Sequence, residues 1–131
     1  MYLIDTNVWL ERLLDQEHAK EVGRFLDTIP SEHLFMTDFT FHSIGIVMTR
    51  LNRKDAFLRF VQDTFIDGAV SLIHLKPEDT QFLIRLIEEF NLDFDDAYQY
   101  TAAEKCNLIM VSFDKDFDRT TRGRKTPAEM T

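Results

Sequence analysis

The sequence predicts a three-layer α/β/α sandwich with a central parallel sheet of four to five strands. Short apolar runs alternate with segments of helical periodicity along the chain, and the runs expected at the centre of the sheet are unbroken by polar residues. Uninterrupted apolar strands are typical of a parallel sheet that helices cover on both faces. The functional crevice of such a sheet lies beyond the carboxyl ends of its strands.

Each predicted element follows from its local pattern. The apolar runs predict strands at residues 2–4, 34–36, 69–75 and 108–111, and residues 124–126 are a candidate fifth strand at an edge. Between these runs, apolar residues recur at steps of three and four, which is the spacing of one helix face. This spacing predicts helices near residues 6–14, 22–29, 41–51, 57–65, 82–90 and 95–105, with Trp9 in the core.

Composition indicates a single domain spanning residues 1–131. Hydrophobic residues make up 44% of the chain and include 12 Phe, which is enough for one core. No apolar run approaches the roughly 20 residues of a membrane span, and the N-terminus lacks the pattern of a signal peptide, so we expect a cytoplasmic protein without membrane association. Cys106 has no second cysteine to pair with, and we expect it to be buried as a small hydrophobic residue.

The net charge of −8 opposes binding to nucleic acid, because phosphate binding depends on Lys and Arg. Two clusters of basic residues offset it locally. The first comprises Arg119, Arg122, Arg124 and Lys125, and the second comprises Arg50, Arg53, Lys54 and Arg59. Each cluster is either a contact surface for a phosphate backbone or an ordinary solvated face of an acidic protein.

Acidic residues recur where strands end. Asp5 follows the first strand and Asp114 follows the last, while Asp96 lies at the start of the helix that leads into the last strand. All three therefore map to the carboxyl edge of the sheet. Carboxylates gathered there repel one another unless protons or a cation neutralise them, and their hard oxygen atoms suit Mg²⁺ or Mn²⁺. We predict a metal site from these three residues together with Asp116, with chemistry suited to a phosphodiester.

Each acidic residue also has a simpler interpretation. Asp5 and Asp93 are well placed to cap helices, and Asp93 forms a capping pair with Asp96 three residues later. The alternating run Asp114, Asp116 and Asp118 is equally typical of a solvated turn. The functional interpretation depends on the three separate sites meeting at one edge.

The same residues resemble the PIN-domain ribonucleases, including the VapC type of toxin. The opening ten residues are similar to that family's first strand and first catalytic acid, with Thr6 and Asn7 at its small polar positions. Asp96-Ala97 followed by Ala102-Ala103-Glu104 is similar to its third-acid helix, and residues 108–117 are similar to its final strand, with Ser112 and Asp114 as its Ser-x-Asp element.

This resemblance implies a divalent-metal endoribonuclease that hydrolyses RNA phosphodiesters, with Asp5, Asp96 and Asp114 as catalytic residues and Mg²⁺ or Mn²⁺ as cofactor. It also implies a homodimer and, for a toxin, an antitoxin partner protein whose tail occupies the acidic groove. The basic cluster Arg119, Arg122, Arg124 and Lys125 is the expected RNA contact.

One departure from the family pattern concerns its usual glutamate. Ser43 stands near the expected place, and Asp38 and His42 are the nearby residues that would compensate. An alternative is therefore a catalytically weak domain of this kind that binds RNA or protein. A receiver-like signalling domain is disfavoured because Lys105 precedes its strand, and a haloacid-dehalogenase-type phosphatase because Asn7 stands where a second Asp is needed.

Overall fold

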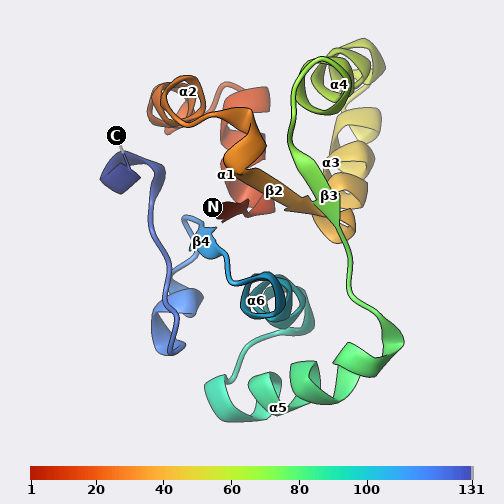
Figure 1. The fold of residues 1–131 in the computed structure, drawn as a ribbon. Coiled ribbons are helices and arrows are strands. Elements are labelled where there is room, and N and C mark those ends of the chain that lie inside the picture. Colours follow the sequence, from red (N-terminus) through yellow and green to blue (C-terminus); the bar gives the residue numbers. More distant parts are fainter. Residues whose placement is uncertain (131) are drawn as a thin grey trace.

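Four short parallel strands form the centre of the protein in a computed structural model that describes residues 1–130. They are β1 (Tyr2–Ile4), β2 (Leu34–Thr37), β3 (Ser71–Ile73) and β4 (Ile109–Val111), in the order β3-β2-β1-β4 (Figure 1). Every neighbouring pair is parallel. The predicted α/β/α class is confirmed. The candidate fifth strand is reduced to a single parallel bridge between Val111 and Lys125.

Six α-helices surround this sheet, one for each predicted helical segment. They are α1 (Thr6–Leu13), α2 (Ala19–Thr28), α3 (Asp38–Arg50), α4 (Lys54–Val61), α5 (Thr80–Phe90) and α6 (Phe94–Cys106). A π-helical turn at Gln62–Ile66 extends α4, and short 3-10 turns occupy Ser31–His33, Pro77–Asp79, Lys115–Arg119 and Pro127–Met130. No helix within residues 1–130 combines the length and the apolar character needed to cross a bilayer.

Alternation of side chains along the strands divides the core into two layers. Ile4, Met36 and Val111 belong to one apolar cluster that includes residues of α1 to α4. Leu3 and Met110 belong to a second cluster, which includes residues of α5 and α6. Figure 1 shows α5 and α6 below the sheet and α1 to α4 above it. Side chains that alternate between the two faces of the strands, with helices covering both faces, thus produce the three-layer sandwich.

Two residues that the sequence predicts to be buried test the predicted core. Trp9 is buried, as predicted, with its ring against Phe60 at a centroid distance of 5.5 Å. The predicted burial of Cys106 is wrong, because this cysteine is exposed. Cys106 is the last residue of α6, and Asn107 then adopts a left-handed conformation that turns the chain towards β4. Helix periodicity does not show where the helix leaves the core.

The order of the strands brings two chain segments together at the carboxyl edge. β1 lies between β2 and β4, and the backbone N–H of Asp5 donates to the carbonyl of Val111 over 2.9 Å. Asp5 and the segment after β4 are therefore neighbours although 106 positions separate Asp5 from Val111. This is the switch point of the sheet, where β1 is followed by β2 on one side and paired with β4 on the other.

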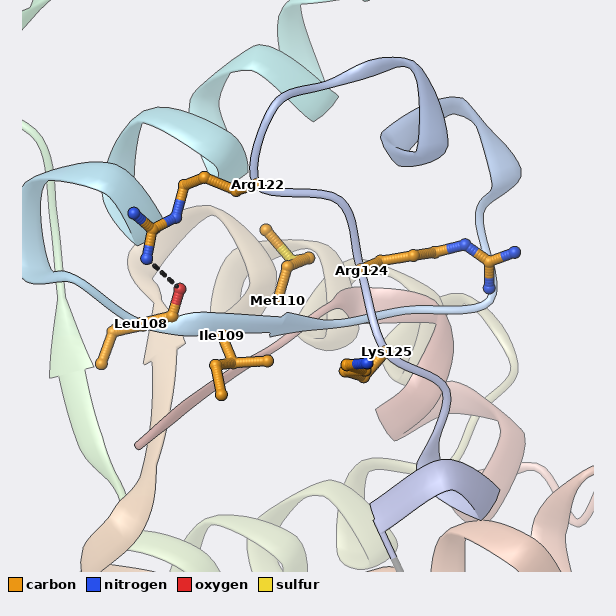
Figure 2. A pocket seen from close by; sticks show the side chains of 6 residues that line it. All are labelled: Leu108, Ile109, Met110, Arg122, Arg124 and Lys125. Atoms are coloured by element: carbon orange, nitrogen blue, oxygen red, sulfur yellow. Dashed lines mark hydrogen bonds between the residues drawn. The ribbon is translucent and has the colours of Figure 1, made fainter.

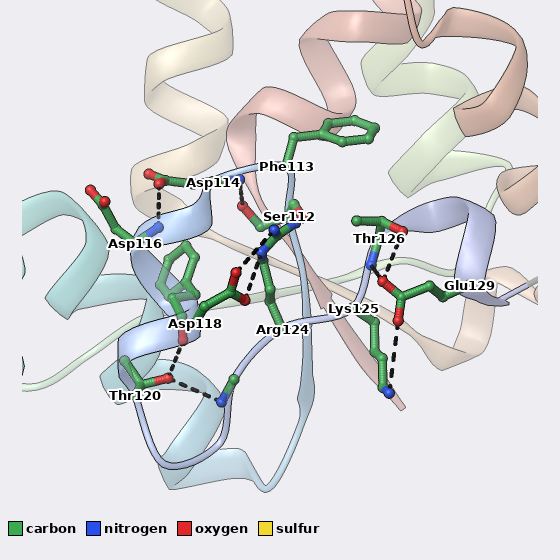
Figure 3. A network of polar contacts seen from close by, with 12 residues as sticks. Ser112, Phe113, Asp114, Asp116, Asp118, Thr120, Arg124, Lys125, Thr126 and Glu129 are labelled. Carbon is green, nitrogen blue, oxygen red and sulfur yellow. Dashed lines mark hydrogen bonds and ion pairs between the residues drawn. The ribbon is translucent and has the colours of Figure 1, made fainter.

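The segment after β4 folds back along that strand and is fixed by arginines. Arg122 Nη2 donates to the carbonyl of Leu108 over 3.0 Å (Figure 2). Arg124 Nη1 donates to the carbonyl of Ser112 over 3.0 Å, and its Nε lies 3.1 Å from Asp118 Oδ1 (Figure 3). The Arg124 side chain is only 13% exposed, so these bonds hold the segment in a largely desolvated place.

Replacement of Arg124 by alanine should therefore destabilise the fold. Hydrogen bonds to a charged donor are worth more than neutral ones, and we expect a loss of about 1–2 kcal/mol in the free energy of unfolding, measured by urea denaturation. Lys125→Ala is the matched control. Lys125 is exposed and pairs with Glu129 at 3.8 Å, so its loss should not be measurable. Equal effects of the two variants would contradict this role of Arg124.

Candidate active site and metal centre

Three carboxylates meet at the carboxyl edge of the sheet. Asp96, Asp114 and Asp116 each offer an oxygen atom, and these atoms lie within 4.8 Å of one another. Asp96 lies in the first turn of α6, where Asp93 Oδ1 accepts its backbone N–H over 2.9 Å. Asp114 precedes the 3-10 turn Lys115–Arg119 and accepts the backbone N–H of Asp116 over 2.8 Å (Figure 3). Capping and clustering are thus compatible uses of the same residues.

Asp5 forms the buried end of this site. Its carboxylate is 7% exposed and accepts three hydrogen bonds, from the Thr6 N–H at 2.8 Å, Gln99 Nε2 at 2.9 Å and Ser112 Oγ at 2.7 Å. It lines a cleft of about 300 Å³ together with Thr6, Asn7, Leu10, Phe39, Ser43, Asp95, Asp96 and Asp114. The structure therefore brings Asp5, Asp96 and Asp114 to one cleft, with Asp116 beside the last two.

The cleft carries uncompensated negative charge. Burial, followed by the nearby charges of Asp114, Asp93 and Asp5, raises the pKa of Asp96 to about 8. Burial also raises the pKa of Asp5, against the opposing effect of its hydrogen bonds from Gln99, Ser112 and Thr6. Within residues 1–130, none of the ion pairs involves Asp5, Asp96 or Asp114. Such a set of hard oxygen donors fits a divalent cation such as Mg²⁺ or Mn²⁺.

The polar residues expected beside the acids connect them. Ser112 Oγ donates to Asp5 Oδ2 and accepts the backbone N–H of Asp114 over 2.9 Å. Asn7 Nδ2 lies 3.3 Å from the same hydroxyl, and Asn7 Oδ1 accepts the N–H of Phe113. Ser112 therefore fixes the distance between Asp5 and Asp114.

Residues near the position of the usual glutamate separate into two groups. Ser43 lines the acidic cleft. Asp38 and His42 line a neighbouring cavity instead, and Asp38 Oδ1 accepts a hydrogen bond of 2.7 Å from the Tyr98 hydroxyl. Thr37, not Asp38, caps α3, since its hydroxyl accepts the N–H of Thr40. The structure does not bring Asp38 or His42 to the other carboxylates.

The sequence analysis did not identify Gln99, a buried residue that donates a hydrogen bond to Asp5. Gln99 is 1% exposed, and its Nε2 donates both to Asp5 Oδ1 and to Thr40 Oγ1, at 2.9 and 2.7 Å. Its Oε1 accepts the Thr37 hydroxyl over 2.6 Å. One signal was available: Gln99 lies three residues after Asp96, on the same face of α6.

The basic residues after β4 are engaged within the protein. Arg119 lies 3.5 Å from Asp116 and so reaches the rim of the acidic cluster. Arg122 pairs with Glu104 and the Leu108 carbonyl, at the amino end of β4 and away from the acidic cleft. With Arg124 and Lys125, it lines a separate cavity of about 250 Å³ along β4 (Figure 2).

Several solved structures of other proteins share this fold. A toxin-antitoxin complex from Klebsiella pneumoniae has a TM-score of 0.78 at 19% identity, over 97% of this chain and 98% of that one. VapC20 of Mycobacterium tuberculosis, described as a sarcin-ricin loop cleaving toxin, has a TM-score of 0.80 at 14% identity, over 97% and 100%. FitAcB from Neisseria gonorrhoeae has a TM-score of 0.76 at 18% identity, over 97% and 98%.

At these identities the three structures establish the fold, and no curated protein matches the sequence. The family comes from the sequence itself, because the profile of the PIN domain matches residues 2–123. This match spans nearly the whole chain and includes every acidic residue of the cleft. The chain therefore belongs to the PIN domain family.

Proposed function

We propose that this protein is a divalent-metal-dependent endoribonuclease that hydrolyses RNA phosphodiesters. The observation that carries the proposal is the convergence of Asp96, Asp114 and Asp116 beside buried Asp5, with no basic side chain neutralising Asp5, Asp96 or Asp114 within residues 1–130. An acidic cleft of this kind repels a phosphodiester unless a cation is bound in it. A metal-dependent reaction on a phosphate therefore suits the site better than simple binding of RNA does.

The residues of the cleft have distinct roles in this proposal. Asp96, Asp114 and Asp116 would hold the cation. Asp5 Oδ2, which within residues 1–130 accepts only the Ser112 hydroxyl, would add a further oxygen at the buried end. A bound cation polarises a phosphoryl oxygen and favours ionisation of the attacking water. Gln99 and Ser112 keep the Asp5 carboxylate in one orientation, so that the site is organised before substrate arrives.

RNA binding requires positive charge near the cleft, and we assign it first to Arg119. Its side chain is 46% exposed and pairs only at the surface, with Asp116 at 3.5 Å and with the Asn91 carbonyl. Lys125 is similarly exposed, whereas Arg122 and Arg124 also hold the segment after β4 in place. We therefore propose that Arg122 and Arg124 have mainly a structural role and contribute less to RNA binding.

The biological setting we propose is a cytoplasmic toxin paired with an antitoxin. Two of the similar structures are described as a toxin-antitoxin complex and as a sarcin-ricin loop cleaving toxin, which supports this setting. We propose a homodimer and an antitoxin that occupies the acidic cleft. The alternative, a catalytically weak RNA-binding or protein-binding domain, is supported by Ser43, which lines the cleft where a carboxylate would add a ligand.

Replacement of Asp5 by asparagine should abolish cleavage and leave the fold intact. The change removes one negative charge from the cleft, so unfolding free energy should stay equal or rise. The assay is cleavage of single-stranded RNA in MnCl₂ or MgCl₂, with EDTA as the metal-free reference. Asp27→Asn, an exposed acidic residue on α2, is the control and should keep full activity. Unchanged turnover in Asp5→Asn would place the activity elsewhere.

Metal binding should release a proton from Asp96. Because the pKa of this carboxyl is about 8 without metal, it is mostly protonated at pH 7 and must ionise to bind a cation. The affinity for Mn²⁺ should therefore rise between pH 6 and pH 8. Calorimetry in buffers of different ionisation enthalpy should count close to one released proton at pH 7. Asp96→Asn should remove both the proton release and most of the affinity.

The same pKa predicts how the metal-free protein responds to pH. The pKa of Asp96 in the folded state lies above its ordinary value of 3.8, so the folded state binds more protons between about pH 4 and pH 8. Its contribution to stability is complete below this window and is lost as pH rises through it. The melting temperature without metal should fall across the window, and MnCl₂ should restore it. A pH-independent affinity and melting temperature would contradict the assignment.

A glutamate at position 43 should strengthen the metal site. Ser43 lines the cleft, and a carboxylate there adds a charged oxygen ligand that the hydroxyl does not supply. Ser43→Glu should bind Mg²⁺ and Mn²⁺ more tightly in calorimetric titration. Asp38→Asn is the matched control and should leave the affinity unchanged, because Asp38 is bonded to Tyr98 in the neighbouring cavity. Equal affinities of wild type and Ser43→Glu would show that α3 does not reach the cation.

A further inference from the structure

An aromatic cavity adjoins the acidic cleft. It has a volume of about 460 Å³ and is lined by Asp38, Phe39, Phe41, His42, Phe94 and Tyr98. Phe39 lines both this cavity and the cleft, so the two spaces lie next to each other with this side chain at their border. A substrate bound in the cleft through a phosphate therefore has a neighbouring group at the entrance of the aromatic cavity.

The rings of this cavity form a preorganised wall. Phe39 and Tyr98 have centroids 6.1 Å apart, and Phe94 and Tyr98 have centroids 6.5 Å apart. The Tyr98 hydroxyl donates to Asp38 Oδ1 over 2.7 Å and accepts the Leu75 N–H over 3.1 Å, which fixes the ring from both sides. A rigid aromatic surface of this kind binds flat apolar rings by stacking.

Phe94 is not explained by the fold. It is 55% exposed and lies in the first turn of α6, between Asp93 and Asp95. Neither buried apolar cluster contains it. An exposed phenylalanine among carboxylates, within one helical turn of Asp96, contributes apolar surface where a substrate of the cleft would pass.

The Asp38 carboxylate of the cavity selects for hydrogen-bond donors. Asp38 Oδ1 already accepts from Tyr98 and from the Phe39 N–H, whereas Oδ2 makes no hydrogen bond within residues 1–130. A free carboxylate oxygen repels a phosphate and accepts N–H groups. The ligand that fits is therefore flat, carries no negative charge on the group in the cavity, and is edged with N–H donors.

We propose that this cavity binds a nucleobase of single-stranded RNA next to the phosphate in the cleft, and that it prefers guanine. Single-stranded RNA is recognised by stacking of splayed bases on aromatic side chains and by hydrogen bonds to their edges. Guanine presents a ring N–H and an amino group side by side, so that two donors can point at Asp38 Oδ2, whereas uracil offers this oxygen a single ring N–H. The proposal rests on the ribonuclease function proposed above, and Phe94 and Asp38 are its specificity-determining residues.

The first test uses nucleosides and needs neither metal nor cleavage. Guanosine, adenosine, cytidine and uridine are titrated into the full chain, and aromatic NMR resonances of Phe94 and Tyr98 are followed. Guanosine should bind most tightly. Phe94→Ala should weaken its binding by roughly tenfold, while Phe94→Trp should retain it. Leu58→Ala, which removes a 65% exposed apolar side chain from α4, is the matched control and should bind as wild type.

Asp38→Asn separates stacking from edge recognition. It should weaken the binding of guanosine more than that of uridine, because guanine directs two donors at Asp38 Oδ2 and uracil directs only one. Equal losses for all four nucleosides would overturn the guanine preference. Absence of nucleoside binding to the wild type would overturn the subsite itself.

Two other occupants are outcomes of the same experiment. Binding of N-acetylarginine amide but of no nucleoside would show that the cavity receives an arginine of a protein partner. A change of mass in Phe94→Ala by light scattering, again without nucleoside binding, would show a contact between copies of this chain. Either result overturns the proposal.

The two proposals fail in distinguishable ways. A wild-type protein that cleaves RNA in MnCl₂ but binds no nucleoside contradicts only the base subsite. A protein that binds guanosine through Phe94 but whose cleavage is indifferent to Asp5→Asn supports the subsite and contradicts the assigned nuclease centre.

Discussion

The burial of one carboxylate at the junction of β1 and β4 determines how the rest of the site is built. Asp5 is nearly inaccessible, so its negative charge has to be compensated by hydrogen bonds from the protein. Those bonds come from α1, α6 and the segment after β4, through Thr6, Gln99 and Ser112. Each donor fixes the element that carries it. The hydrogen bonds to Asp5, at the buried end of the cleft, therefore hold α1, α6 and the segment after β4 together.

This arrangement also reduces the destabilising repulsion between the carboxylates of the cleft. Asp93 and Asp114 each accept a backbone N–H at the start of a helical turn, where negative charge is favourable. Asp96 accepts a proton instead, since its pKa is about 8. The remaining repulsion between the carboxylates of the cleft favours binding of a cation, because a divalent ion relieves this repulsion.

Much of the arrangement was predictable because it depends on strand ends. Asp5 and Asp114 follow apolar runs that predict strands of one parallel sheet, and Asp96 lies at the start of the helix that leads into the second of these runs. The partners of these acids were not predictable. Gln99 reaches Asp5 across 94 positions in the chain, and Asp38 is turned towards Tyr98 rather than the cleft. Such choices depend on rotamers and packing across elements, which residue spacing does not encode. For the same reason, the arginines of the basic cluster Arg119, Arg122, Arg124 and Lys125 do not form one surface, because each one contacts a different part of the protein.

The chain after β4 has one further consequence, for the borders of the sheet. The backbone of Lys125 donates to the Met110 carbonyl over 2.8 Å and accepts the Ser112 N–H over 3.0 Å. The outer side of β4 is thereby occupied by the protein's own backbone, whereas β3, at the other border, is a strand of three residues with Leu72 exposed. Exposed strand borders recruit strands from other molecules. The returning chain therefore shields the β4 border, next to the acidic cleft, from intermolecular pairing, and within residues 1–130 the other border of the sheet is the short strand β3.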